Sequence, residues 1–103
     1  MQITGSMVIG QESLFGSAGT IKAINPATNS EFEPAFGLAT KEDVDQACQL
    51  AAAAFDSYRE TTPEQRATFL EKIAENILAL GNTLIERAHQ ETGLPVARLE
   101  GER

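Results

Sequence analysis

The sequence predicts an α+β segment, with β-hairpins over residues 1–38 followed by three to four helices over residues 39–103. The first third combines short apolar runs with glycine, asparagine and proline turn signals, which is typical of hairpins. From residue 40 onward apolar residues recur at helical spacing, and threonine, proline and glycine mark the helix ends. At 103 residues, the chain is expected to be a single segment within one domain.

The first hairpin is expected close to the start of the chain. Apolar residues at positions 7–9 precede a polar, glycine-containing turn at 10–13, and Leu14 and Phe15 resume the apolar pattern.

A second hairpin follows. Residues 21–24 predict a strand that ends at Pro26, because proline has no amide hydrogen to donate to a strand ladder. Beyond the turn, an extended segment alternates apolar and polar residues, and its proline indicates the edge of a sheet. Its apolar face consists of Phe32, Pro34 and Phe36.

The helical pattern begins at Thr40, a good N-cap residue with Asp43 three positions later, as in a capping box. One apolar stripe then follows at helical spacing. It contains Val44, Ala47, Cys48, Ala51, Phe55 and Tyr58.

A second helix is marked more clearly. Thr62 supplies the N-cap, Pro63 takes the first helical position, and Gln65 completes a capping box. Its stripe contains Ala67, Leu70, Ile73, Ala74, Ile77 and Leu78.

Gly81 and Asn82 indicate a break before a third helix, although the stripe keeps its phase, so one long kinked helix is the alternative. Gly93 ends this element, and Pro95 is expected in the first turn of a fourth helix. The sequence stops inside that helix without a cap or breaker.

Composition excludes several classes of function. The net charge of −7, from 15 acidic and 8 basic residues, disfavours binding to nucleic acid or to an anionic membrane surface. No apolar run approaches the roughly 20 residues of a membrane span, and the start lacks the pattern of a signal peptide. One cysteine cannot form an internal disulfide, which fits a reducing compartment, so a cytoplasmic location is expected.

The candidate chemical groups are few. Cys48, the only thiol, lies on the apolar stripe and is expected to be a small buried core residue, not a nucleophile. His89 has Glu86 one turn away, but a position at the surface or a hydrogen-bonded one in the interior is favoured over catalysis or metal binding. The glycines form no phosphate-binding motif and are assigned to turns. No nucleophile with a base and an orienting group is apparent.

The order of four short motifs is more specific than any one of them. Residues 23–29 (AINPATN) resemble the V-N-P-A-T-G turn of the aldehyde dehydrogenase superfamily, and Asn29 can adopt the left-handed conformation of the commoner glycine. Residues 40–47 (TKEDVDQA) resemble A-x-x-x-D-V-D-x-A. Residues 62–67 (TPEQRA) resemble P-E-E-R-A, and 91–95 (ETGLP) resemble E-T-G-K-P with leucine in place of lysine.

The match covers roughly residues 20 to 103, and further similarities point to the ketoglutarate-semialdehyde (2,5-dioxovalerate) dehydrogenase subgroup. These similarities lie at residues 3–5, 9–10, 34–36, 55–59 and 91–103.

The resemblance implies an α/β family fold, of which residues 1–103 would be the N-terminal part of the cofactor-binding domain. It implies oxidation of an aldehyde, here 2,5-dioxovalerate, to the acid with NADP or NAD, in a homo-oligomeric parent enzyme. In the family a cysteine attacks the aldehyde, hydride passes to the nicotinamide, and a glutamate-activated water releases the acid. Those catalytic and cofactor-binding residues are expected beyond position 103, so the piece alone should be inactive.

Some members of the family hold a structural monovalent cation near these motifs. The resemblance transfers its ligands to the backbone carbonyls of Ala23 and Ile24 and to the Glu91 carboxylate, while a plain surface carboxylate at position 91 is the alternative. For the whole chain, the alternative from another class is a stand-alone α+β interaction module that uses its helical stripes to bind a partner.

Overall fold

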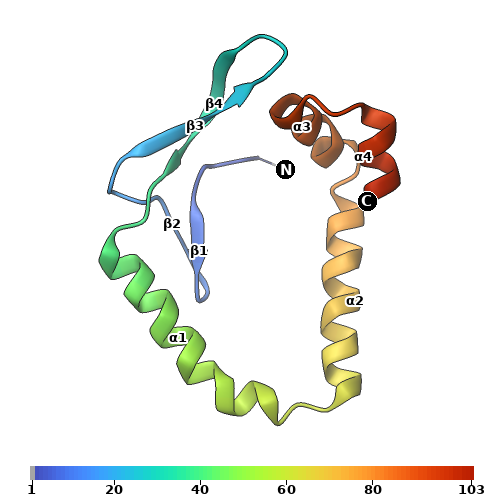
Figure 1. Ribbon diagram of the computed structural model, residues 1–103. Helices are drawn as coiled ribbons and strands as arrows, with labels where there is room; N and C mark the ends of the chain where they lie inside the picture. Colours follow the sequence, from blue (N-terminus) through green and yellow to red (C-terminus); the bar gives the residue numbers. More distant parts are fainter. Residues whose placement is uncertain (1) are drawn as a thin grey trace. The chain divides into compact units, whose positions relative to one another are not determined.

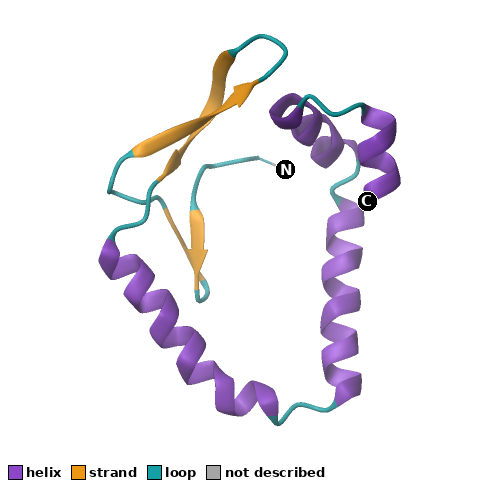
Figure 2. Ribbon diagram, in the orientation of Figure 1, coloured by secondary structure: helices purple, strands orange, loops and turns teal. Residues whose placement is uncertain are grey.

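The computed structural model describes residues 2–103, which form four short strands followed by four helices (Figures 1 and 2). The predicted α+β class is confirmed. The elements are β1 (Met7–Ile9), β2 (Glu12–Leu14), β3 (Thr20–Asn25), β4 (Ser30–Gly37), α1 (Lys41–Arg59), α2 (Pro63–Ala79), α3 (Asn82–Thr92) and α4 (Val96–Glu102).

These elements belong to two compact units. The N-terminal unit contains residues 2–23 and 32–61, and the C-terminal unit contains residues 24–31 and 62–103.

The first hairpin pairs β1 with β2 in antiparallel register, with Met7 opposite Leu14 and Ile9 opposite Glu12. Only Gly10 and Gln11 remain between the strands, so the predicted four-residue turn at 10–13 is too long. Gly10 has a φ of +62°, which a glycine adopts without the steric penalty of a side chain. A tight two-residue turn of this kind fixes the register of the pairing.

Close backbone contacts hold the segment after β2 to the end of β4. The amide of Ala18 donates to the Leu38 carbonyl at 3.1 Å, and the Leu38 amide donates to the Gly19 carbonyl at 2.9 Å. A Cβ at Gly16 would lie 2.1 Å from the Leu38 oxygen. Gly16 therefore allows two backbones to approach closely, whereas the sequence suggested only a turn.

The second hairpin pairs β3 with β4, and its turn has the expected geometry. Asn29 has a φ of +54°, which confirms that asparagine occupies the left-handed position. The carbonyl of Asn25 accepts from the Asn29 amide at 2.7 Å, and its side chain accepts from the Ala27 amide at 2.9 Å. Across the strands, Lys22 forms an ion pair with Glu33.

Both predicted capping boxes are present. The Thr40 hydroxyl accepts from the Asp43 amide at 3.1 Å, and the Asp43 carboxylate accepts from the Thr40 amide at 2.8 Å. At the start of α2, the Thr62 hydroxyl accepts from the Gln65 amide at 3.2 Å, and the Gln65 side chain accepts from the Thr62 amide at 2.8 Å. Each box satisfies amides that a helix start would otherwise leave unpaired.

The break after α2 is real, and the kinked-helix alternative is wrong. Gly81 adopts φ +56° and ψ −138°, a conformation outside any helix, and α3 starts at the next residue. Gly93 closes α3 in the left-handed conformation, as expected. Pro95 is the N-cap of α4 and so lies just before the first turn, in which it was predicted.

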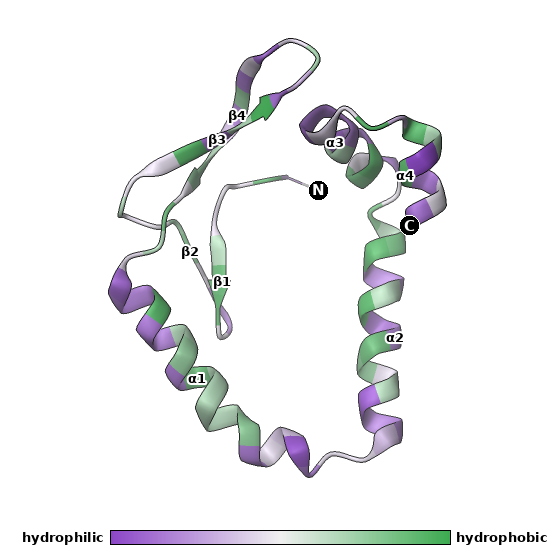
Figure 3. Ribbon diagram, in the orientation of Figure 1, coloured by the Kyte–Doolittle hydropathy of each residue, from purple (hydrophilic) through white to green (hydrophobic). Residues whose placement is uncertain are grey.

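The buried core of the described residues is thin. Ile9 and Ile85 are the only buried hydrophobic residues in 2–103, and α1, α2 and α4 contain no buried residue. Hydrophobic positions recur along α1 and α2 (Figure 3), and most of these side chains remain exposed.

Exposure also corrects the prediction for Cys48, which is exposed and not buried. The helical stripe on which it lies is apolar, and all its residues except Ala47 are exposed. Within residues 2–103, no helix combines the length and apolar character needed to cross a membrane.

Candidate functional site

The two motifs that carry most of the family resemblance meet in the C-terminal unit. Pro26 lies in the β3–β4 turn and Gly93 ends α3, and a Cβ built on Gly93 would lie 3.1 Å from Cγ of Pro26. Gly93 therefore serves two purposes. Its φ of +70° reverses the chain after α3, and its missing side chain leaves room for the proline ring.

A group of hydrogen bonds fixes the chain as it leaves α3. The Gly93 amide donates to the His89 carbonyl at 2.9 Å, and the Thr92 hydroxyl donates to the Ala88 carbonyl at 2.6 Å. The Leu94 amide then donates to the Thr92 hydroxyl at 3.2 Å. The bond to His89 satisfies one of the four carbonyls that the end of a helix leaves without intrahelical partners.

His89 belongs to this cap. Its Nδ1 lies 2.7 Å from the Leu94 carbonyl oxygen, so this nitrogen carries the proton and donates it. The side chain is exposed, and its contact is a backbone oxygen and not Glu86. His89 thus lies at the surface, one of the two positions favoured from the sequence, and its backbone partner was not foreseen.

The proposed cation ligands occupy both units. Ala23 and Ile24 lie near the end of β3. Ile24 belongs to the C-terminal unit, as Glu91 does, whereas Ala23 belongs to the N-terminal unit. Glu91 lies in the last turn of α3, where its Oε1 accepts from Nε of Arg87 at 2.6 Å. Sequence reasoning missed this ion pair, although the i, i+4 spacing of Arg87 and Glu91 signals it.

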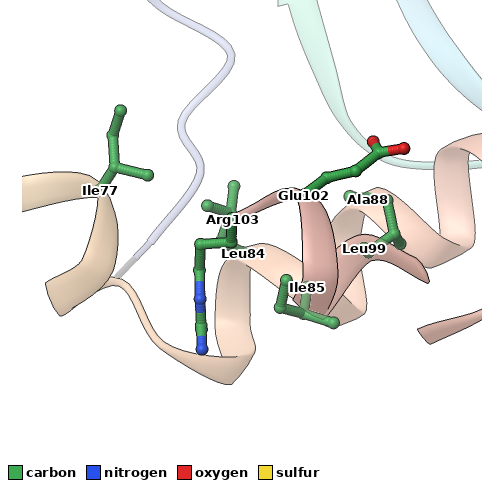
Figure 4. Close-up of a pocket in the computed structure, with 7 residues that line it drawn as sticks. All are labelled: Ile77, Leu84, Ile85, Ala88, Leu99, Glu102 and Arg103. Carbon is green, nitrogen blue, oxygen red and sulfur yellow. The ribbon is translucent and has the colours of Figure 1, made fainter. Parts of the chain in front are cut away.

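An apolar groove lies within the C-terminal unit, where α3 and α4 pack together (Figure 4). Its volume is ≈ 260 Å³. The residues that line it are Ile77, Leu84, Ile85, Ala88, Leu99, Glu102 and Arg103. The helical spacing predicted the apolar residues of α2 and α3, but it could not show that α4 would fold beside them.

The described residues offer little catalytic chemistry. In residues 2–103, no group of three or more histidine, cysteine, aspartate or glutamate side chains is placed to hold a metal ion. At Glu33, the hydrogen bond from Lys22 lowers the pKa of the carboxyl below its ordinary value. That pair lies on an exposed hairpin and contributes to local structure.

Comparison with known proteins gives a consistent result. The sequence model of the aldehyde dehydrogenase family matches residues 15–103. Over its whole length the chain is 57% identical to alpha-ketoglutaric semialdehyde dehydrogenase 2 of Azospirillum brasilense, and the match covers 20% of that protein. Over 95% of its length the chain is 45% identical to alpha-ketoglutaric semialdehyde dehydrogenase of Acinetobacter baylyi, and this match covers 19% of that protein. A weaker similarity, 44% identity over 55% of the chain, relates it to 11% of a 1-pyrroline-5-carboxylate dehydrogenase of Bacillus pumilus.

The chain spans about a fifth of the length of the first two relatives. No solved structure matches it significantly. The ordered motifs predicted this family, and these matches do not favour the stand-alone interaction module.

Proposed function

Because this chain belongs to the aldehyde dehydrogenase family, we propose that it is the N-terminal part of an NAD(P)-dependent dehydrogenase that oxidises α-ketoglutaric semialdehyde (2,5-dioxovalerate) to the acid. The observation that carries the proposal is the 57% identity of the entire chain to a relative with that substrate in its name. In this proposal, residues 1–103 form one segment of the cofactor-binding domain of a cytoplasmic homo-oligomer.

The role of this segment is structural. The residues described here bring two family motifs together at Pro26 and Gly93, and they present apolar helical faces. The nucleophile, the base and the nicotinamide-binding residues belong to the four-fifths of the family polypeptide that this chain does not match. NAD or NADP would accept the hydride there.

The experiment joins residues 1–103 to the part of the Azospirillum brasilense relative that lies outside the match; this fusion is called the chimera. The 103-residue chain alone should give no aldehyde-dependent reduction of NAD⁺ or NADP⁺, whereas the chimera should reduce one of them when given α-ketoglutaric semialdehyde. Turnover by the pure 103-residue chain, or a folded but inactive chimera, would contradict the proposal.

A structural cation at Ala23, Ile24 and Glu91 is part of the same proposal. Carbonyl and carboxylate oxygens suit a hard cation, although Arg87 already engages one oxygen of Glu91. If the cation binds there, the chimera should melt at a higher temperature in NaCl or KCl than in choline chloride. Glu91→Gln should abolish this difference, and Glu86→Gln on the same helix should keep it. An equal salt response in both variants would refute the cation site.

A further inference from the structure

Glu91 places a negative charge at the end of a helix where that charge is unfavourable. It lies in the last turn of α3, and the C-terminal end of a helix carries a partial negative charge from its carbonyl groups. A carboxylate at this end is therefore stabilised by a positive charge beside it. The Glu91 side chain is 40% exposed, so a dissolved cation can reach it as well as a side chain can.

The same helix supplies a positive charge. Arg87 lies one turn before Glu91, and its Nε donates to Glu91 Oε1 at 2.6 Å, a short charge-assisted hydrogen bond. The guanidinium does not lose its proton in proteins. Only 17% of the Arg87 side chain is exposed, so breaking this pair takes a carboxylate away from a largely desolvated charge, which is costly.

A monovalent cation on Glu91 would bring a second positive charge to the carboxylate that Arg87 holds. Two like charges about 4 Å apart repel enough to weaken binding roughly fivefold in bulk water and several hundredfold at an effective dielectric constant of about 20. Because Glu91 is partly exposed, the effect at this residue should lie between these limits. A neutral hydrogen-bond donor would orient a metal-binding carboxylate without this repulsion.

We propose that Arg87 is an internal competitor for the structural cation at Glu91, so that the cation binds weakly while the Arg87–Glu91 pair is intact. The inference rests on the cation site of the proposed function. It goes further by naming the residue of this chain that sets the affinity of that site. The end of α3 is then stabilised by Arg87 when sodium and potassium are scarce, and by the cation when they are abundant.

A salt titration of the melting temperature tests the competition. NaCl or KCl replaces choline chloride at constant ionic strength, and the midpoint of the rise in melting temperature of the chimera measures its apparent affinity for the cation. Arg87→Gln removes the positive charge and keeps a polar side chain. The midpoint for this variant should lie at a cation concentration about tenfold or more below that of the unaltered chimera.

Two matched variants separate the charge from other effects of the substitution. Arg87→Lys keeps a positive charge at the same i, i+4 spacing from Glu91, so it should keep the midpoint of the unaltered chimera. Arg98→Gln removes a guanidinium whose Nε donates to Glu102 at 2.9 Å, also at i, i+4 spacing, and leaves Glu91 untouched. It should leave the midpoint unchanged as well.

Crystal structures of the unaltered chimera add a readout that does not depend on the folding of any variant. Crystals grown in RbCl and in choline chloride are compared, because the anomalous scattering of Rb⁺ locates the ion. With Rb⁺ at Glu91, the bond between Arg87 Nε and Glu91 Oε1 should be broken, and in choline chloride it should be intact. An intact bond beside bound Rb⁺ would overturn the competition.

The outcomes of the titration separate this inference from the proposals on which it rests. An equal midpoint in Arg87→Gln and the unaltered chimera overturns the competition and leaves the cation site standing. A higher midpoint in Arg87→Gln would show that Arg87 helps the cation to bind, which also overturns the competition. No cation response in any variant overturns the competition together with the cation site, while the dehydrogenase function is decided separately by the reduction of NAD⁺ or NADP⁺.

Discussion

Replacing Gly93 by alanine is expected to loosen the contact between the β3–β4 turn and the end of α3. Gly93 has a φ of +70°, and a Cβ at this position would lie 3.1 Å from Cγ of Pro26 and 3.9 Å from its Cβ. The substitution therefore introduces both backbone strain and a close contact.

Each effect has an estimated magnitude. An alanine in the left-handed conformation costs roughly 1–2 kcal/mol, and about 0.4–1 kcal/mol of this is offset by the lower entropy of the unfolded chain. Overpacking against the proline ring adds about 1 kcal/mol, the lower end of the usual range. The free energy that keeps this region closed should thus fall by about 2 kcal/mol.

The contact can be isolated with a second substitution. Pro26→Ala removes Cγ and keeps Cβ at an ordinary contact distance, so Gly93→Ala should cost about 1 kcal/mol less in the Pro26→Ala background. Gly101→Ala is the control, because a Cβ there meets nothing within 4 Å and its φ is not left-handed. It should be neutral or mildly stabilising, as alanine favours a helix over glycine.

Hydrogen exchange followed by NMR measures the local opening. The amide of residue 93 donates to the His89 carbonyl, and the Asn29 amide donates to the Asn25 carbonyl, so each reports one side of the contact. A loss of about 2 kcal/mol corresponds to roughly 30-fold faster exchange in Gly93→Ala. If Gly93→Ala speeds exchange equally in the wild-type and Pro26→Ala backgrounds, the contact between residues 26 and 93 is refuted. If Gly93→Ala leaves the exchange rate unchanged, the backbone strain is refuted as well.

Three further predictions concern the helix caps, the hairpin charge pair and the exposed apolar faces. Thr62→Ala should reduce the stability of α2 by about 1 kcal/mol, seen as lower helicity by circular dichroism, because it removes the oxygen that accepts from the Gln65 amide; Thr62→Ser should keep it. Lys22→Ala should raise the pKa of Glu33 toward its ordinary value in an NMR titration. Because the folded-state pKa of Glu33 is lowered, the support that this pair gives the hairpin is present at neutral pH and lost as the pH falls through that pKa; an unchanged titration in Lys22→Ala would contradict this cause. The isolated chain should melt broadly and bind a hydrophobic dye, since so few of its apolar residues are buried, and a sharp melt without dye binding would contradict the exposed faces.

Local signals in the sequence predicted much of the fold. The capping residues Thr40 and Thr62, the helix stops Gly81 and Gly93, and the left-handed Asn29 all act within a few positions of themselves. Such short-range chemistry can be read from the residues alone.

The contacts that the structure shows between distant positions were not predicted from the residues. The fit of Pro26 against Gly93 and the backbone approach at Gly16 depend on where separate elements come to lie. The burial assigned to Cys48 failed for a related reason, because an apolar stripe predicts which face will be covered and does not supply the covering partner.

The candidate site was predicted only in part. The sequence placed Glu91 at the end of a helix, but it did not reveal the ion pair with Arg87 or the bond between His89 and the Leu94 carbonyl. Side chains at i and i+4 can pair on a helix, and many do not, so the spacing alone did not settle their arrangement.

The central claim is that residues 1–103 are an interchangeable N-terminal scaffold of an aldehyde dehydrogenase. The most direct test compares the rate of NAD(P)H formation from α-ketoglutaric semialdehyde by the chimera with that of the Azospirillum brasilense relative lacking the matched fifth. Activity in the chimera and none in the shortened relative is the predicted result. Equal activity in both, or a correctly folded chimera without activity, would contradict the account.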